Sequence, residues 1–425
     1  MQIITTAIFI IAYILILSFN NKKHWISLGT GFIFILLGIL PYQNIVQTID
    51  WNVLLMMTGT MGLVSLFIES KMPNLMADII MKKVPNIQFA AIALSLFAGI
   101  ISAFVDNVAT VLMIAPVALA VCRKLKTNPI PFIICIAVSS NLQGAATLVG
   151  DTTAIMLGSA LNMSFMDFFI YNNKPSIFFA VELGAILSAF IVGFIFRKNK
   201  EPIEKISEKT LVTDIIPTIL LFGNILALII ASFIPNKPDI TNGIISCIIF
   251  FIGLIRDCIT GNGIKDAKEH LENIDISTLC FLSGLFLMIG GVQNVGIIDK
   301  LANFLANLGN NNIFFMYTII VIASVLISAF IDNIPYVATM IPVINGIATT
   351  MNMDPTIFYF GLLSGATLGG NITPIGASAN ITAIGLLKKE NYNVKNSDFF
   401  KIGIPFTLAA IIPAYIYLWL IYGMY

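Results

Sequence analysis

Long hydrophobic runs separated by short polar segments make up most of this chain. A helix needs about 20 apolar residues to cross the roughly 30 Å of hydrocarbon in a bilayer. Eight runs are long enough for one crossing each, at residues 3–19, 25–41, 53–70, 174–196, 212–234, 240–255, 276–294 and 402–422. The pattern therefore predicts a helical protein that crosses the membrane many times.

Two other hydrophobic runs are nearly twice too long for a single crossing. They cover residues 87–122 and 313–349, and each holds an Asp-Asn pair near its middle, Asp106-Asn107 and Asp332-Asn333. A hairpin of two helices that enters and leaves on the same side of the membrane fits both the length and the central polarity. We therefore expect two re-entrant helical hairpins with an Asp-Asn pair at each tip.

Two more runs, residues 129–162 and 355–387, are interrupted halfway by Gly, Thr, Asn and Asp. Such interruptions predict helices that are broken near the membrane centre, which would be the ninth and tenth crossings. Segments 71–86 and 295–309 mix apolar and charged residues, as amphipathic helices lying in the membrane interface do.

The two halves of the sequence repeat each other. Each repeat, residues 1–200 and 210–425, holds five crossings, one of them broken, and one re-entrant hairpin. Because five is odd, the second repeat must enter the membrane from the opposite side. The predicted fold is all-α and polytopic with two inverted repeats, which is the plan of many secondary transporters. One offset of 226 positions pairs SAFVDN (102–107) with SAFIDN (328–333), Pro116 with Pro342, Pro129 with Pro355, Gly144 with Gly370, Thr147 with Thr373, and Gly150 with Gly376.

The composition excludes a soluble protein and gives no sign of a nucleic-acid partner. Hydrophobic residues make up 58% of the 425 residues and charged residues 11%, whereas soluble domains carry about 25% charged residues. The net charge is +1, and the five cysteines lack metal-type spacing. The chain has no Walker-type phosphate loop and no nucleophile-base constellation, so we expect no enzymatic activity and no cofactor beyond a coupling ion, H⁺ or Na⁺.

The basic residues gather on one side of the predicted topology. All of the 23 except Lys174, Lys237 and Lys300 lie in loops of that side, and cytoplasmic loops hold the excess of Lys and Arg. We therefore expect an inner or plasma membrane protein with both termini outside the cytoplasm. No basic residue is left for the membrane interior, so an anionic substrate would depend on helix N-termini or on a co-bound cation. His24 and His270 are expected in polar loops.

Three carboxylates, Asp106, Asp151 and Asp332, are expected inside the membrane. An ionised carboxylate is costly there, so it marks a functional site by default. Each lies where a helix is interrupted, and the backbone carbonyls freed at such breaks can coordinate a cation alongside the carboxylate. The alternative is that Asp106 and Asp332 only cap the returning arms of the hairpins. Asp151 pairs with Ala377 in the repeat alignment, so the first half is the preferred H⁺ or Na⁺ site.

The broken segments, residues 139–152 and 365–380, combine glycine with neutral side-chain oxygens that suit Na⁺ or a polar solute. Close helix packing along a glycine-rich face is the alternative interpretation. The candidate Na⁺ sites are Asp106, Asn107 and Asp151 in the first half and Asp332 and Asn333 in the second. The full set of candidates for binding the substrate or ion is Asp106, Asn107, Thr110, Ser140, Asn141, Thr147, Asp151, Thr152, Asp332, Asn333, Asn371, Thr373, Ser378 and Asn380, with Gly144, Gly150, Gly369, Gly370 and Gly376 as backbone hinges.

Three motifs of this chain, SAFVDNVATVLMIAPV, SAFIDNIPYVATMIPV and GATLGGNITPIGASAN, resemble the ion transporter superfamily. The resemblance covers nearly the whole chain and is to the branch of arsenite permeases, NhaD-type antiporters and melanosomal P-proteins, with a citrate transporter-like domain. It implies a hairpin-plus-broken-helix site in each repeat and dimerisation through a scaffold. Dicarboxylate relatives, which move the hairpin domain like an elevator, carry Ser-Asn-Thr at the tips. P-protein relatives tend to have Pro-Pro-Asn where this chain has Thr152-Thr153-Ala154.

The leading hypothesis is a secondary active transporter in the lipid bilayer that couples H⁺ or Na⁺ movement to a small ion, an arsenite-like oxyanion or an organic anion. Na⁺/H⁺ antiport is one alternative. A passive anion channel of the P-protein type is another, because the membrane interior is expected to lack basic residues that would trap an anion.

Overall fold

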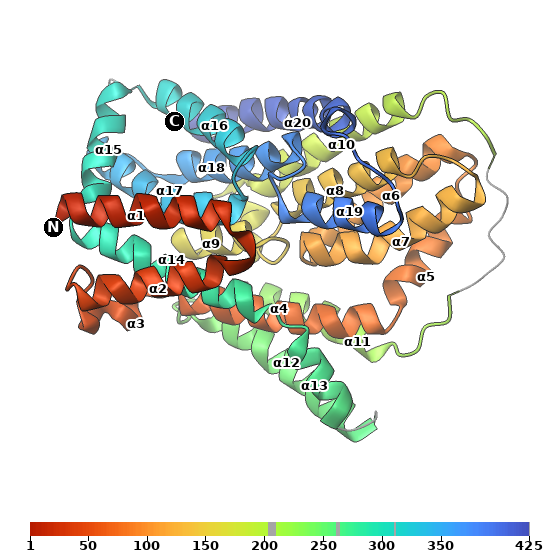
Figure 1. Ribbon diagram of the computed structural model, residues 1–425, viewed down its shortest axis with the longest axis horizontal. Coiled ribbons are helices and arrows are strands. Elements are labelled where there is room, and N and C mark those ends of the chain that lie inside the picture. Colours follow the sequence, from red (N-terminus) through yellow and green to blue (C-terminus); the bar gives the residue numbers. More distant parts are fainter. Residues whose placement is uncertain (203–209, 261–263, 310–311, 425) are drawn as a thin grey trace.

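The computed structural model describes residues 1–202, 210–260, 264–309 and 312–424. Most helices run along the long axis of the molecule, and the N- and C-termini lie at the same end of it (Figure 1). Four shorter apolar helices, among them Gln2–Ser18 and Ile216–Ser232, accompany the long ones. Within the described residues, six helices are long and apolar enough to cross a membrane: Trp51–Glu69, Asn107–Lys124, Ile177–Ile195, Thr241–Thr260, Ala267–Asn294 and Asn396–Gly423.

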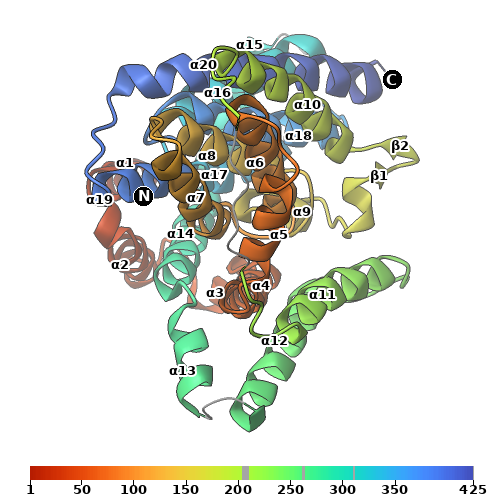
Figure 2. The same cartoon turned by 90° about the vertical axis from the view of Figure 1, so that its right-hand side faces the viewer.

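Six helices, here called the panel, form one side of the molecule (Figure 2). Small residues let their backbones approach closely. A Cβ on Gly284 would lie 2.4 Å from the backbone of Ser27 and Leu28, and one on Gly59 would lie 2.4 Å from the backbone of Ser246. The panel consists of α1 (Gln2–Ser18), α2 (Lys23–Leu36), α4 (Trp51–Glu69), α11 (Ile216–Ser232), α12 (Thr241–Thr260) and α14 (Ile276–Asn294).

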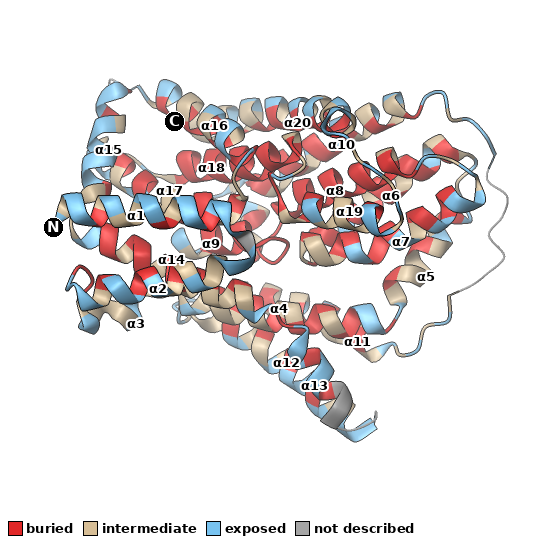
Figure 3. Cartoon of the chain, viewed as in Figure 1, coloured by how far each residue is buried: buried red, intermediate tan, exposed pale blue. Residues whose placement is uncertain are grey.

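The remaining long helices form a second bundle, here called the core, which packs against the panel through α9 and α17. Every residue of α18 is buried, as is every residue of α8 except Pro131 (Figure 3). The core consists of α6 (Ile87–Ser102), α7 (Asn107–Lys124), α8 (Ile130–Gly144), α9 (Thr152–Ala160), α10 (Ile177–Ile195), α16 (Ile313–Ser328), α17 (Asn333–Thr350), α18 (Thr356–Gly369), α19 (Ser378–Lys389) and α20 (Asn396–Leu418).

Short elements complete the chain. Helices α5 (Met72–Met81) and α15 (Ile297–Leu308) link the panel to the core at opposite ends of the molecule (Figure 1). These two fall in the segments with mixed apolar and charged composition. The others are α3 (Ile45–Thr48), α13 (Ile264–Glu272), 3₁₀ turns at Asn20–Lys22, Tyr42–Asn44, Met166–Phe168 and Gly370–Ile372, a π-turn at Trp419–Gly423, and the antiparallel strands β1 (Ile170–Tyr171) and β2 (Lys174–Pro175).

Two helical hairpins, α6–α7 and α16–α17, reach the middle of the molecule from opposite ends (Figure 1). Their helix boundaries differ by 226 positions throughout. Each tip is closed by an aspartate at the N-cap of the returning helix. Asp106 Oδ1 accepts hydrogen bonds from Val108 N at 2.9 Å and Ala109 N at 3.2 Å. Asp332 Oδ1 accepts a longer one, 3.4 Å, from Ile334 N.

Two breaks, between α8 and α9 and between α18 and α19, lie against the hairpin tips. A Cβ on Gly150 would lie 2.6 to 2.9 Å from the carbonyl oxygens of Gly144, Ser102 and Ala103. Gly376 has the equivalent three neighbours at 2.6 to 2.9 Å. Only glycine allows the backbone of the break to approach the tip this closely, so each hairpin is held against its broken helix.

Candidate functional site

The first hairpin tip contacts both halves of the chain through a chain of amides. Asn107 Nδ2 donates to Asn141 Oδ1 at 3.1 Å. Asn141 Nδ2 in turn donates to Thr367 O at 2.8 Å and to Asn371 Oδ1 at 3.0 Å. Asn371 Nδ2 donates to Val138 O, in the first broken helix, at 3.0 Å. The first tip, the first broken helix and the second broken helix therefore meet in one buried polar network.

The second hairpin tip reaches across to Asp151. This carboxylate is 4% exposed, and its Oδ2 accepts from Asn333 Nδ2 at 3.3 Å and from Thr153 Oγ1 at 3.0 Å. Thr153 Oγ1 also lies 3.5 Å from Thr367 Oγ1. The carboxylate that breaks the sequence symmetry therefore lies where the two repeats meet.

Asp332 has a basic partner, which corrects the sequence prediction for this carboxylate. Lys23 Nζ, at the start of α2, lies 3.7 Å from Asp332 Oδ2, and Ser378 Oγ donates to the same oxygen at 3.1 Å. The expectation that no basic residue is left beside the carboxylates of the membrane interior is therefore wrong at Asp332. The reason is that the turn before α2 ends next to the second tip, a proximity that loop charge counting does not detect.

Several candidates from the sequence serve the backbone and lie away from open space. Thr147 and Thr373 donate to the hairpin-tip carbonyls of Ala103 and Ala329. Asn380 Nδ2 donates to the carbonyls of Gly370 and Thr373 at 2.9 and 3.0 Å. These groups hold the tips and breaks in shape. Likewise, Ser140 donates to Asn107 O at 3.0 Å, Thr110 lies 3.5 Å from Val105 O, Gly369 packs on Val325, and Gly144 and Gly370 lie at the ends of the breaks.

A cavity of about 970 Å³ between panel and core leads to the hairpin tips. Asp106, Asn107, Asp151, Thr152 and Asn333 line it, together with Ser378. Its other charged lining residues are Lys23, Glu69, Glu269 and Asp275. Acidic groups therefore outnumber the one lysine among the described lining residues, so the cavity attracts cations. We call it the tip cavity.

A second cavity, of about 820 Å³, lies between panel and core beyond the tips. The end of α14 and the start of α4 line it, with parts of α9 and α17. The tip cavity is lined by the end of α4 and the start of α14, with parts of α7 and α19. Asp50, whose Oδ2 accepts from Ser159, and Asn52 are polar residues of the second cavity that the sequence analysis did not single out. We call it the opposite cavity.

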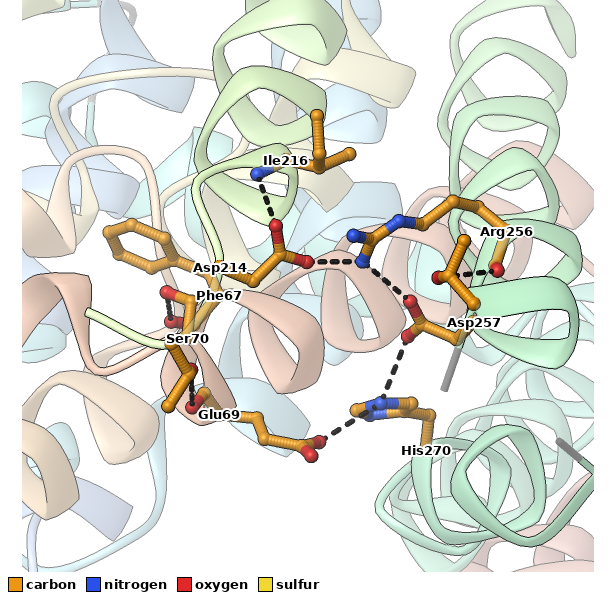
Figure 4. A network of polar contacts seen from close by, with 10 residues as sticks. Phe67, Glu69, Ser70, Asp214, Ile216, Arg256, Asp257 and His270 are labelled. Atoms are coloured by element: carbon orange, nitrogen blue, oxygen red, sulfur yellow. Dashed lines mark hydrogen bonds and ion pairs between the residues drawn. The ribbon is translucent and has the colours of Figure 1, made fainter. Parts of the chain in front are cut away.

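His270 is buried in a polar cluster beside the tip cavity, which corrects its predicted place in a polar loop (Figure 4). Its Nε2 lies 3.0 Å from Glu69 Oε2 and 3.4 Å from Asp257 Oδ2, and Arg256 bridges Asp257 to Asp214. Helix α13 was not expected from the sequence, and it packs this histidine against α4 and α12. The cluster ties four elements of the panel side together.

Oxygen atoms dominate the groups around the tips. No cluster of three or more His, Cys, Asp or Glu side chains suited to a metal ion occurs in the part of the chain that the structure describes. The carboxylates of Asp106 and Asp151 and the amide oxygen of Asn107 are instead hard oxygen donors, which suit Na⁺. Carboxylates can also take up H⁺.

Comparison with known proteins gives a family and a fold. The family profile described as "Citrate transporter" matches residues 13–365. An uncharacterized transporter of Mycobacterium bovis is 30% identical over 99% of both chains. The 46 kDa membrane protein of Mycobacterium leprae is also 30% identical, over 99% of both. The human P protein is 25% identical, over 85% of this chain and 52% of its own.

Two solved transporters share the fold. The YdaH transporter of Alcanivorax borkumensis superposes with a TM-score of 0.59 at 13% identity, covering 90% of this chain and 88% of its own. MtrF of Neisseria gonorrhoeae, described among antimetabolite efflux pumps, gives a TM-score of 0.54 at 16% identity over 96% and 84%. At these identities the likeness concerns the fold alone.

Proposed function

Because the chain belongs to the citrate transporter family, a family of multi-pass membrane transporters, we propose that it is a secondary active transporter driven by H⁺ or Na⁺. The observation that carries this proposal is the pair of first-half carboxylates, the half-buried Asp106 and the buried Asp151, at the inner end of an open cavity. A carboxylate in such surroundings is stable when a cation neutralises it. Loading and release of that cation would then accompany each transport cycle.

The proposed cycle is alternating access by two inverted repeats. The repeated helix boundaries support it, as do the hairpins that approach from opposite ends. The two cavities support it further, because exchanging α4 with α14, α7 with α17 and α19 with α9 converts the described lining of one into that of the other. In the present conformation, Asp106 and Asp151 are reached through the tip cavity. A displacement of the core against the panel would close it and open the opposite cavity.

The distribution of Lys and Arg among the loops indicates which side of the membrane each cavity would face. Under the proposed topology the tip cavity faces the cytoplasm and both termini lie outside, since the turn at Lys22-Lys23 and helix α13 are near its mouth. Assembly as a homodimer through the panel is part of the same proposal. It would leave the core free to move within each subunit.

The substrate in this proposal is a small ion, an arsenite-like oxyanion or an organic anion such as citrate. An anion entering a cavity rich in carboxylates needs a co-bound cation, and Lys23 adds one fixed positive charge. A cation substrate would need neither, which keeps Na⁺/H⁺ antiport as the second candidate.

Flux into proteoliposomes tests the proposal. Purified protein would be tested with labelled citrate, arsenite, antimonite and Na⁺, each with and without an imposed pH gradient and Na⁺ gradient. Uptake of at least one solute that depends on either gradient is expected. Flux that ignores both gradients, or unitary currents far above carrier turnover, would contradict cation coupling and favour the passive anion channel.

A further inference from the structure

The ammonium of Lys23 contacts both the second hairpin tip and helix α14. It lies 3.7 Å from Asp332 Oδ2 and 5.0 Å from the ring centroid of the buried Phe281 on α14. The next residue, His24, anchors the start of α2 because its Nδ1 lies 2.8 Å from Ser277 Oγ. The side chains of Lys23 and Asp332 are only 16% and 20% exposed. The position of this positive charge is therefore built into the panel.

The second half-site also offers oxygen groups that a small cation could use. Asp332 offers a carboxylate oxygen, and the hydroxyl of Ser378 lies 3.1 Å from it. Both are hard oxygen ligands of the kind that Na⁺ takes. A second positive charge this close to Lys23 would be repelled, so the ammonium and a Na⁺ exclude each other at Asp332.

The first half-site has no such partner. Asp106 accepts hydrogen bonds from backbone amides, and none of the ion pairs among the described residues includes it or Asp151. The two repeats therefore differ in the source of their positive charge. The first-half carboxylates need a mobile cation, whereas Asp332 in the second half already has one that is attached to the chain.

We propose that Lys23 is a tethered counter-ion that fills the second cation site, so that Na⁺ is excluded from Asp332 and can exchange only at the first half-site. The inference rests on the proposed cation coupling and concerns how many ions take part. It predicts that removing the Lys23 charge creates a second Na⁺ site. A positively charged replacement should leave the number of sites unchanged.

The test is equilibrium binding of radiolabelled Na⁺ to the purified full-length protein, with K⁺ as the background cation. The variants are Lys23→Gln, Lys23→Arg, the double variant Lys23→Gln/Asp332→Asn, and Lys22→Gln as the matched control at an exposed neighbouring lysine. Size-exclusion chromatography and the Tm establish that each variant is folded. Lys23→Gln should bind one more Na⁺ per chain than the wild type, and the other three should match the wild type.

The outcomes separate this inference from the proposed function. An extra Na⁺ in Lys23→Gln that disappears in the double variant supports it. Equal binding by Lys23→Gln and wild type, or an extra ion that persists without Asp332, overturns it. Cation coupling itself is decided independently by the gradient dependence of flux in the wild type. If Lys23→Gln does not fold, a Lys23→Met variant tested in the same way replaces it.

Discussion

Replacing the glycine at either break with alanine should separate the hairpin tip from its broken helix. At Gly150 the added Cβ would lie 2.6 Å from Gly144 O, 2.7 Å from Ser102 O and 2.9 Å from Ala103 O. At Gly376 the three carbonyls lie at 2.6, 2.8 and 2.9 Å. All are backbone atoms, so no side chain can rotate away, and the tip must move by several tenths of an ångström.

The expected cost is that of overpacking, about 1 to 3 kcal/mol per substitution. If that cost falls on the transport-competent state, flux decreases roughly 5- to 150-fold. The Tm should decrease by about 1 to 3 °C, because the unfolding entropy of a 425-residue chain corresponds to about 1 °C per kcal/mol. A helix interior without such contacts behaves oppositely, since alanine is favoured over glycine by about 0.5 to 1 kcal/mol.

Gly385→Ala is the matched control, because a Cβ there has nothing within 4 Å. Gly150→Ala, Gly376→Ala and Gly385→Ala would be compared by Tm in detergent and by gradient-driven flux in proteoliposomes. The control should be as stable as the wild type or more so, with full flux. If the first two variants behave like the control, the close approach of tip and break is not required, and the reasoning is refuted.

Further predictions concern the site and the cavities. Asp106→Asn should abolish gradient-driven flux without reducing membrane insertion, whereas Asp299→Asn, at an exposed position of α15, should do little; equal activity of the two would count against the cation site. Asn141→Ala should lower the Tm, since each buried amide that it leaves unpaired costs about 1 to 3 kcal/mol; an unchanged Tm would show that the network is dispensable. In a chain without its native cysteines, Ser65→Cys in the tip cavity should react with an impermeant thiol reagent from the cytoplasmic side only, and Asn44→Cys in the opposite cavity only from outside; labelling of both from one side would refute the proposed sidedness.

The hairpins and the broken helices could be predicted because their signals are local. A run too long for one crossing must turn back, and the Asp-Asn pair is the polar place for the turn. The boundaries of α6–α7 and α16–α17 lie within a few residues of the expected ones. Glycine and small polar residues likewise identify the break between α8 and α9.

The contacts between distant segments could not be predicted from one sequence. The pairing of Lys23 with Asp332 depends on how the panel packs against the core, and so does the burial of His270 by α13. The sequence also cannot tell which threonines and asparagines face open space. Thr152 lines the tip cavity, whereas Thr147 and Asn380 donate their side-chain hydrogen bonds to backbone carbonyls. The rotation of each helix around the break decides which polar side chains face the cavity. The hydrophobic pattern of the sequence does not give this rotation.

The central claim is that the first-half carboxylates use a cation gradient to accumulate solute. The most direct measurement is the steady-state ratio of internal to external solute in proteoliposomes under an imposed Na⁺ or H⁺ gradient, for wild type and for Asp106→Asn/Asp151→Asn. The wild type should concentrate the solute and lose that ratio when the gradient is collapsed, while the double variant should never exceed a ratio of one. Accumulation by the double variant, or equilibration alone by the wild type under either gradient, would contradict it.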